Sequence, residues 1–369
     1  MSAIFAYYFP QFYETKENSK WWGQGFTDWK LVKEAQPLYD GHNQPRVPQL
    51  GYYDQSDLNT LRQQVGLANQ FSITGFNFYH YWFNGKPYLS KPIEMLHDNA
   101  DLNVRYMLTW ANESWTRQWI GKPNDYLIKQ AYYNSNADLE LHYFYMSSFF
   151  KDKRYYKINN RPVLSIYRPE LIPGINEVLK RFNELAIKDG FSGVYLLACR
   201  NYDISGAAEL YKSFQGIINF NPRYIINTRL KNSHANFLEP LLRRLPESMQ
   251  SLMVSLKHKK NKPNVFSYNK FLEELDKSVD ICFSKPVYHS VFPDWDNTAR
   301  YKQRATLFND TSVNGFRKAL SISKNKLTEN HENLLFINAW NEWSEGAYLE
   351  PDYLNGTSLL HVASEFTKK

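Results

Sequence analysis

Eight short runs of apolar, β-branched or aromatic residues alternate with segments of helical spacing along the whole chain. No internal repeat or change of composition interrupts this order. Alternating strands and helices build parallel sheets, and eight such units are the number that closes a barrel. The pattern therefore predicts a (β/α)8 TIM barrel with long βα loops. The expected strands cover residues 4–9, 73–79, 104–109, 161–167, 194–199, 215–219, 279–283 and 334–338.

The competing α/β architecture is a doubly wound sheet. Such a sheet binds nucleotides through a glycine-rich turn, and neither GxGxxG nor GxxxxGK[ST] occurs in the sequence. We therefore expect a single catalytic barrel over residues 1–369. Its expected helices begin near Ser56 and then cover 91–99, 137–150, 175–189, 268–277 and 302–324.

A basic segment interrupts the regular alternation at residues 224–264. The stretch 223–263 holds nine Lys or Arg against Glu239 and Glu247, which equals the net charge of +7 of the whole chain. Because the excess charge is local, general nucleic-acid binding is disfavoured. Leucines and methionines at helical spacing predict a helical insertion that caps the barrel. The alternative is contact with a membrane surface or an anionic substrate through 224–264.

The cysteines and the apolar runs bear on location. Cys199 and Cys282 each lie in an apolar run and are expected to be buried free thiols on strands. The first residues lack a signal-peptide pattern, and no apolar run reaches the ~20 residues of a membrane span. These features predict a cytoplasmic protein, with membrane-peripheral association as the alternative.

Polar and aromatic side chains cluster where the predicted strands end. Active sites of such barrels lie at the carboxyl ends of the strands, and aromatic residues make up 17% of this chain. Aromatic faces with polar edges suit sugar rings, so we expect a carbohydrate site. The candidate substrate-binding residues are Tyr8, Gln11, Trp29, Tyr79, His80, Tyr81, Trp82, Trp110, Asn112, Glu113, Trp115, Asp294, Trp295, Asn297, Arg300, Trp340, Asn341 and Trp343.

Glu342 and Glu345 are the candidate catalytic pair. Glycosidic cleavage uses two carboxyl groups, or one carboxyl and a neighbouring sugar hydroxyl. A spacing of three residues on a helical turn puts the Cβ atoms ~5–6 Å apart, which favours retention of configuration. The adjacent Trp340 and Trp343 are expected to exclude water and to raise the pKa of at least one carboxyl. Glu113 is a third candidate, for catalysis or for hydroxyl binding.

Two further features have competing interpretations. His80 is as readily a hydrogen-bonded core residue as a substrate contact. Asp294-Trp295-Asp296 matches the short DxD pattern of metal-dependent glycosyltransferases, but the two aspartates are better interpreted as hydroxyl acceptors or loop-fixing residues. No His, Cys and Asp cluster has metal-ligand spacing. We therefore expect no metal and no cofactor.

The motifs together carry a family resemblance. Residues 341–346 (NEWSEG) resemble the catalytic segment of the glycoside hydrolase family 99 endo-α-mannosidases. The whole set is most similar to the WbsX family of bacterial capsule and O-antigen clusters. The supporting motifs are AYYFPQF at 6–12, GFTDW at 25–29, FYHYWF at 78–83, WANESWTR at 110–117 and VFPDWDNTAR at 291–300.

The resemblance implies a mechanism. In the endo-mannosidases the first glutamate acts as a base on the sugar 2-hydroxyl, which attacks its own anomeric carbon. The second acts as acid and then as base, and no covalent enzyme intermediate forms. By this resemblance Glu342 takes the first role and Glu345 the second. Ser344 departs from the pattern, because those enzymes carry histidine there, and this leaves the substrate open.

Three functions are compatible with these residues. The favoured one is a retaining, endo-acting hydrolase of a mannose- or rhamnose-type linkage in a bacterial polysaccharide or oligosaccharide. The alternative is a glycosyltransferase of capsule or O-antigen biosynthesis. The third is a non-catalytic carbohydrate-binding barrel, which the paired glutamates disfavour.

Overall fold

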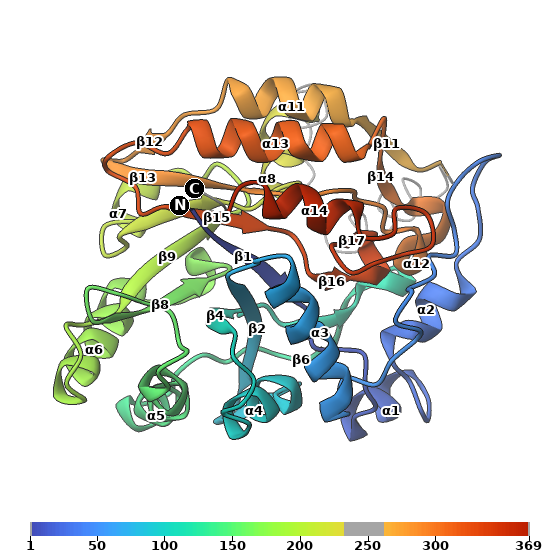
Figure 1. The fold of residues 1–369 in the computed structure, drawn as a ribbon. Coiled ribbons are helices and arrows are strands. Elements are labelled where there is room, and N and C mark those ends of the chain that lie inside the picture. Colours follow the sequence, from blue (N-terminus) through green and yellow to red (C-terminus); the bar gives the residue numbers. More distant parts are fainter. Residues whose placement is uncertain (1, 232–261, 368–369) are drawn as a thin grey trace, which may run out of the picture.

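A closed barrel of parallel strands forms the centre of the molecule (Figure 1). The computed structural model describes residues 2–231 and 262–367. Within these residues eight strands pair in parallel around the barrel, and β2 pairs back onto β1 to close it. The predicted (β/α)8 barrel is thus confirmed. In order around the barrel the strands are β1 (Ala3–Tyr8), β15 (Leu334–Ile337), β13 (Lys285–Val291), β10 (Gly216–Asn219), β9 (Tyr195–Arg200), β8 (Arg161–Ile166), β4 (Arg105–Trp110) and β2 (Gly75–Phe83).

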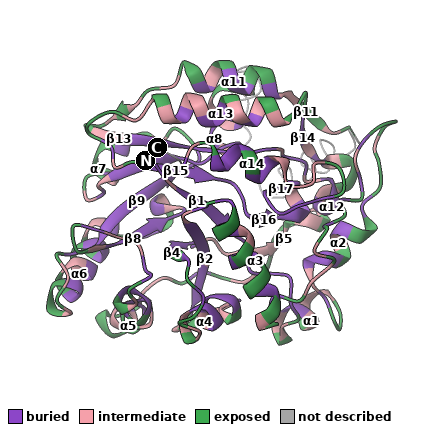
Figure 2. Cartoon of the chain, in the orientation of Figure 1, coloured by how far each residue is buried: buried purple, intermediate pink, exposed green. Residues whose placement is uncertain are grey.

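Helices cover the outside of the barrel and bury their apolar stripes against it (Figure 2). In α6, Ile175, Val178, Leu179 and Phe182 repeat at the spacing of one helix face and are buried. Burying side chains of this size contributes roughly 1.5–3 kcal/mol each. The outer helices are α3 (Leu58–Gln70), α4 (Lys91–Asp98), α5 (Asn136–Lys151), α6 (Ile175–Lys188), α7 (Ala207–Leu210), α11 (Tyr268–Asp276), α13 (Val313–Asn325) and α14 (Ser358–Ser364). The short α8 (Arg223–Ile225) follows the carboxyl end of β10.

Short elements build the loops between the strands and helices. Two pairs matter for the site: β5 pairs antiparallel with β6, and β16 pairs antiparallel with β17. The loop elements are α1 (Lys16–Trp22), α2 (Asp28–Glu34), β3 (Lys86–Tyr88), β5 (Trp115–Arg117), η1 (Gln118–Ile120), β6 (Lys122–Ile128), β7 (Lys157–Ile158), η2 (Pro169–Leu171), η3 (Ile226–Leu230), β11 (Asn264–Ser267), β12 (Ile281–Cys282), α12 (Thr298–Tyr301), η5 (Lys302–Arg304), β14 (Thr306–Asn309), β16 (Asn341–Glu342), η6 (Trp343–Glu345) and β17 (Ala347–Tyr348).

The seventh barrel strand is not where the sequence pattern placed it. The run at 279–283 contains only the two-residue β12, which pairs antiparallel with the start of β13. The barrel strand at this position is β13, which contains Pro286, His289 and Ser290. Because of these residues it is not a continuous apolar run, and the sequence pattern did not predict it. Cys282 on β12 is consequently only partly buried, whereas Cys199 on β9 is buried as expected.

The helix expected over 302–324 is also wrong in its first part. Thr306–Asn309 forms β14, which pairs with β11, and the paired residues are 42 positions apart in the chain. The helix α13 starts only after Ser312, whose hydroxyl accepts a hydrogen bond from the Gly315 amide and caps it. A long-range pairing thus overrides local helical spacing.

Most of the predicted insertion at 224–264 lies outside the described residues, and with it the predicted contact with a membrane or an anionic ligand. Its described beginning is α8, followed by the π-helical turn η3. None of the helices described over 2–231 and 262–367 has the length and apolar character needed to span a membrane.

Candidate active site

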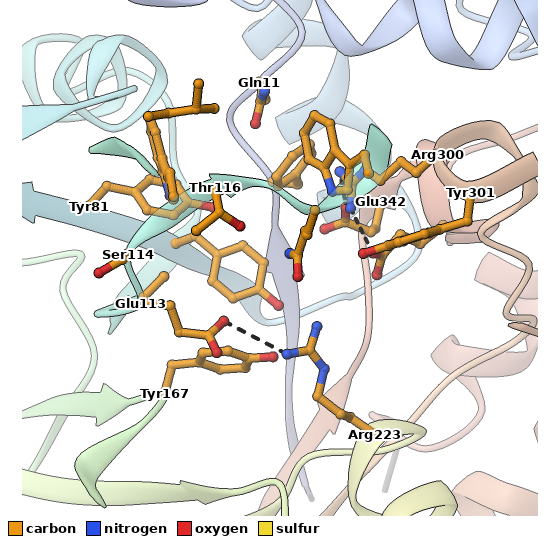
Figure 3. A pocket seen from close by; sticks show the side chains of 18 of the residues that line it. Gln11, Tyr81, Glu113, Ser114, Thr116, Tyr167, Arg223, Arg300, Tyr301 and Glu342 are labelled. Atoms are coloured by element: carbon orange, nitrogen blue, oxygen red, sulfur yellow. Dashed lines mark hydrogen bonds and ion pairs between the residues drawn. The ribbon is translucent and has the colours of Figure 1, made fainter. Parts of the chain in front are cut away.

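A cavity opens at the carboxyl ends of the barrel strands. It occupies about 1050 Å³ including its open mouth. Its walls come from Tyr79 and Tyr81 of β2 and from the residues after β1, β4, β8, β10, β13 and β15, so segments far apart in the sequence meet there (Figure 3).

The segment after β15 forms a tight hairpin that presents both candidate glutamates to the cavity. Asn341 pairs with Tyr348 and Glu342 with Ala347, and η6 lies between them. The hairpin closes at Gly346, which has a φ of +66°. A Cβ atom there would lie 3.0 Å from the Asp296 amide nitrogen, so both conformation and space require glycine.

Arg300 on α12 bridges the two glutamates. Its Nη2 donates to Glu342 Oε1 at 2.8 Å and its Nη1 to Glu345 Oε1 at 2.7 Å. The same Nη2 lies 2.8 Å from Asp28 Oδ2, which also accepts from the Ser344 hydroxyl at 2.7 Å. One guanidinium thus holds both carboxyl groups on one side of the cavity, and Asp28 holds the guanidinium.

The protonation of this cluster follows from its charge. Three carboxyl groups surround one arginine, so a proton on the cluster reduces the excess negative charge. Burial, with further contributions from the charges of Glu345 and Asp28, raises the pKa of Glu342 to about 8, although Arg300 opposes the shift. The expected raised pKa is therefore found at Glu342. A carboxyl that keeps its proton near neutral pH can take part in acid–base catalysis.

Aromatic rings form a second wall of the cavity. Tyr81 contacts Trp115 edge to face at 5.0 Å between ring centroids. Trp22 on α1 stacks on Trp119 of η1 at 5.3 Å, which joins the loop after β1 to the loop after β4. Flat rings of this kind bind the apolar faces of sugars.

The opposite wall is charged. Glu113 lies between two arginines: its Oε1 pairs with Arg168 Nη1, and its Oε2 lies 3.7 Å from Arg223 Nη1. Arg168 also pairs with Glu170. Figure 3 shows Glu113, Tyr167 and Arg223 together, across the cavity from Glu342 and Arg300.

The structure brings nine of the twenty predicted residues into the cavity wall. The other eleven have side chains that contact other parts of the protein. Those that line the cavity are Gln11, Tyr79, Tyr81, Glu113, Trp115, Trp295, Arg300, Glu342 and Glu345.

His80, Trp82 and Trp110 face the outside of the barrel and not the cavity. His80 Nε2 lies 2.8 Å from His142 Nε2 on α5, and the rings of Trp82 and Trp110 pack on the same histidine. Successive side chains of a strand point to opposite faces, so the inward Tyr79 and Tyr81 require the outward direction of their neighbours. The hydrogen-bonded core interpretation of His80 is the one that the structure supports.

A second group lies behind the glutamate hairpin. The indole Nε1 atoms of Trp340 and Trp343 both donate to Glu350, at 3.1 and 2.6 Å. Tyr8 donates to Gln64 of α3, and the Asn341 amide bonds to the backbone of Phe9. The two tryptophans therefore support the hairpin from behind rather than cover the carboxyl groups.

Three more candidates have structural partners. Trp29 packs on Phe12 with ring centroids 4.1 Å apart. Asn112 Nδ2 donates to the backbone oxygen of Arg168 at 2.7 Å, and Asn297 Oδ1 accepts from the Thr306 amide at 2.7 Å. They fix loops of the rim and do not line the cavity.

Asp294 and Asp296 are engaged by basic and polar side chains. Arg46 donates to Asp294 at 2.7 Å, and His42 and Gln44 contact Asp296 Oδ2 at 2.8 and 2.5 Å. The loop-fixing interpretation therefore fits this pair. In the described parts of the chain, no three His, Cys, Asp or Glu side chains are grouped so as to hold a metal ion.

Sequence reasoning missed several residues of the site. Arg223 lies four residues beyond the end of β10, farther along the chain than the residues that directly follow a predicted strand. Trp119 follows a short strand in the loop after β4. Asp28 belongs to the motif at 25–29 and could have been found there as the one acidic residue of that motif.

Comparison with known proteins places the chain in a family. A family model described as "Glycosyltransferase WbsX" matches residues 4–363. The uncharacterized protein WxcX of Xanthomonas campestris pv. campestris strain B100 is 30% identical over 373 residues, which cover 99% of this chain and 49% of that protein. WxcX of strain ATCC 33913 is 29% identical over 375 residues. The chain thus spans about half the length of the curated relatives it matches.

Solved structures share the fold. A glycoside hydrolase-like protein has a TM-score of 0.59 at 12% identity and covers 100% of this chain and 94% of that chain. The GH99 endo-alpha-mannosidase from Bacteroides thetaiotaomicron, in complex with bis-tris-propane, has a TM-score of 0.58 at 12% identity and covers 99% and 96%. At this level of identity the similarity is one of fold.

Proposed function

This chain belongs to the WbsX family, and on that premise we propose that it is a glycoside-processing enzyme, more specifically a retaining glycoside hydrolase. The observation that carries the proposal is the position of Glu342 and Glu345. Both face one aromatic-walled cavity, and both bind Arg300. Most glycosidases cleave their substrates with two carboxyl groups that face one substrate cavity.

The chemistry needs one proton on the pair and one free carboxylate. By resemblance to the endo-α-mannosidases, Glu342 takes the proton of the substrate 2-hydroxyl, and that oxygen attacks the anomeric carbon. Glu345 gives its proton to the leaving oxygen as the glycosidic bond breaks. It then takes a proton from the water that attacks C1, and the C1–O2 bond breaks as Glu342 returns its proton to O2. A base whose pKa is near the working pH is better matched to a weakly acidic hydroxyl than an ordinary carboxylate. The single proton of the pair must then lie on Glu345, and the ionised Glu342, whose pKa is raised, is a stronger base than an ordinary carboxylate.

The proposed substrate is a manno-configured linkage of a polysaccharide or oligosaccharide. A reaction through the 2-hydroxyl suits mannose and rhamnose, in which that group is axial. A second cavity of about 1320 Å³, its mouth included, shares Trp22, Trp119, Arg300 and Tyr301 with the first. Adjoining cavities on either side of the Trp22–Trp119 stack suit several consecutive sugars, which supports endo action.

Glycosyl transfer is the alternative, and the description of the family favours it. A nucleotide-sugar donor needs a metal or a phosphate cradle. Asp294 and Asp296, the DxD carboxylates, do not line the cavity and are bound by Arg46, His42 and Gln44. This arrangement makes transfer the less supported of the two reactions.

The test is a turnover assay without nucleotide sugar or metal. Aryl α-mannosides, aryl α-rhamnosides and mannose- or rhamnose-rich polysaccharides are offered to the wild type, Glu342→Gln and Glu345→Gln. We expect the wild type to release reducing ends and each variant to lose ~10²-fold or more in kcat/KM. The surface variant Glu365→Gln serves as control and keeps full activity. The hydrolase proposal would be overturned if the wild type released no reducing ends from any substrate and transferred sugar once a nucleotide sugar and a divalent metal were added.

A further inference from the structure

Arg223 is a cation in the cavity wall whose donors are largely uncommitted. It begins α8 directly after Pro222 and faces the cavity opposite the catalytic pair (Figure 3). Its charged partner is Glu113, at 3.7 Å between Nη1 and Oε2, which is longer than a hydrogen bond. Within residues 2–231 and 262–367, no side chain or carbonyl accepts a hydrogen bond from Arg223. A guanidinium has five N–H donors, so those of Arg223 are available to a ligand in the cavity.

The surroundings of Arg223 keep it charged and oriented. Its guanidinium carbon lies 5.7 Å from the ring centroid of Tyr167, which buttresses it. Glu113 does not neutralise it fully, because the other oxygen of that carboxylate is bound by Arg168. Arginine in such a position binds a carboxylate through two parallel hydrogen bonds, which a hydroxyl cannot offer.

The balance of charge around Arg223 limits the kind of anion. Arg223 and Arg168 carry two positive charges, and Glu113 and Glu170 carry two negative charges. A ligand group with one negative charge can bind the Arg223 guanidinium, and its repulsion by the neighbouring carboxylates is small. A doubly charged phosphate meets Glu113 and the catalytic carboxylates at the same time. A uronic acid carboxylate is therefore the better fit.

The overall charge of the chain agrees with an acidic substrate. The formal net charge is +7 at pH 7. A net positive charge attracts a polyanion and raises its rate of association.

We propose that the substrate is an acidic polysaccharide and that Arg223 binds the carboxylate of a uronic acid residue in the catalytic cavity. The proposal rests on the proposed function, since it names the substrate class of the same site. Arg223 is then a specificity-determining residue. Glu113, fixed by Arg168, contacts a hydroxyl of the same sugar.

A binding experiment tests this without any turnover. The probes are methyl α-D-mannopyranoside and methyl α-D-mannopyranosiduronate, which differ only in carrying CH2OH or carboxylate at C5. Binding is followed by tryptophan fluorescence, because Trp21, Trp22, Trp115 and Trp119 line the cavity. We expect the wild type to bind the uronoside at least about tenfold more tightly, since a charge-assisted bidentate pair replaces a neutral contact.

Two variants separate recognition from general charge. Arg223→Gln is expected to abolish the preference and leave the affinity for the neutral glycoside within about twofold. Arg229→Gln removes the same charge from an exposed residue of η3 that does not line the cavity, and is expected to retain the preference. Equal binding of both glycosides by the wild type, or a preference that survives Arg223→Gln, would overturn the proposal. So would tight binding of inorganic phosphate or uridine diphosphate in place of the uronoside.

An activity arm distinguishes this proposal from the hydrolase proposal. If the chain hydrolyses oligosaccharides, Arg223→Gln is expected to raise KM about tenfold or more for uronate-containing substrates and to leave KM for carboxyl-reduced ones within about twofold. If it hydrolyses nothing but still binds the uronoside through Arg223, the hydrolase proposal fails and the recognition proposal stands.

Discussion

Arg300 is the residue on which the charges of the catalytic wall converge. It binds Glu342, Glu345 and Asp28 through two nitrogens, and Ser344 fixes Asp28 from the other side. The Ser344 hydroxyl donates to the same Asp28 oxygen that accepts from Arg300, so Ser344 helps to position Arg300.

The network predicts the alkaline limb of the pH profile. Catalysis needs one proton on the Glu342–Glu345 pair, and the pKa of Glu342 is raised to about 8. Above that pH the pair loses its last proton and no acid remains for the leaving group. We therefore expect kcat/KM to fall above about pH 8, measured on the free enzyme at low substrate concentration.

Asp28→Asn tests the cause of that limb. The negative charge of Asp28 contributes to raising the pKa of Glu342. Its removal makes loss of the proton easier, so the limb moves to lower pH, whatever happens to the absolute rate. An unchanged limb in Asp28→Asn would show that another group controls it.

At the scale of elements, β2 has one face in the cavity and the other packed against α5. Tyr79 and Tyr81 line the cavity, while His80 faces His142 of α5 on the outside. His142 Nδ1 also lies 2.6 Å from the Tyr133 hydroxyl. Burial lowers the pKa of His80 to about 3 and places that of His142 well below its usual value. Docking of α5 on the barrel therefore requires neutral imidazoles.

This packing predicts an acid sensitivity. Below the unfolded pKa of about 6.5, His80 binds a proton in the unfolded chain but not in the folded one, so wild-type stability is lost as the pH falls. His80→Gln cannot titrate at this position. We expect His80→Gln to be less stable than the wild type at pH 7. The difference in free energy of unfolding between the two proteins is expected to decrease by up to about 2 kcal/mol by pH 5. Urea unfolding of both proteins at pH 7, 6 and 5 measures this difference. A difference that stays the same at all three pH values would contradict the prediction.

At the scale of the whole molecule, Glu350 ties distant segments together behind the site. Its two oxygens accept from Gln64 of α3, Tyr53, Trp340 and Trp343 at 2.6 to 3.1 Å. The loop after β1, an outer helix and the glutamate hairpin thus share one buried carboxyl group. This hub holds the hairpin at the mouth of the barrel.

Glu350→Gln is expected to destabilise the fold although it conserves size. The amide nitrogen is a donor and would face donors, which leaves buried groups unsatisfied and costs about 1–3 kcal/mol. Denaturant unfolding at pH 7 measures the change. Glu365→Gln, which breaks the exposed pair with Arg317, should stay within about 0.5 kcal/mol of the wild type. A loss at Glu350 no larger than this would show that the hub is dispensable.

The sequence by itself determined the barrel and the place of its chemistry. Strand and helix order depends on local periodicity, and the glutamate segment follows the last strand, so both could be predicted from neighbouring residues. The same reasoning failed at β13 and β14, where polar strand residues and a pairing between distant segments outweighed local pattern.

Only the tertiary structure decided which side chains face the cavity. A shift of one residue reverses every side chain of a strand, so the sequence could not separate Tyr79 and Tyr81 from His80 and Trp82. Nor could it bring Arg300 to both glutamates and to Asp28, or Arg223 to Glu113, because these contacts join residues that are 42 to 272 positions apart in the chain. These contacts form when the barrel closes, and the local sequence pattern does not predict them.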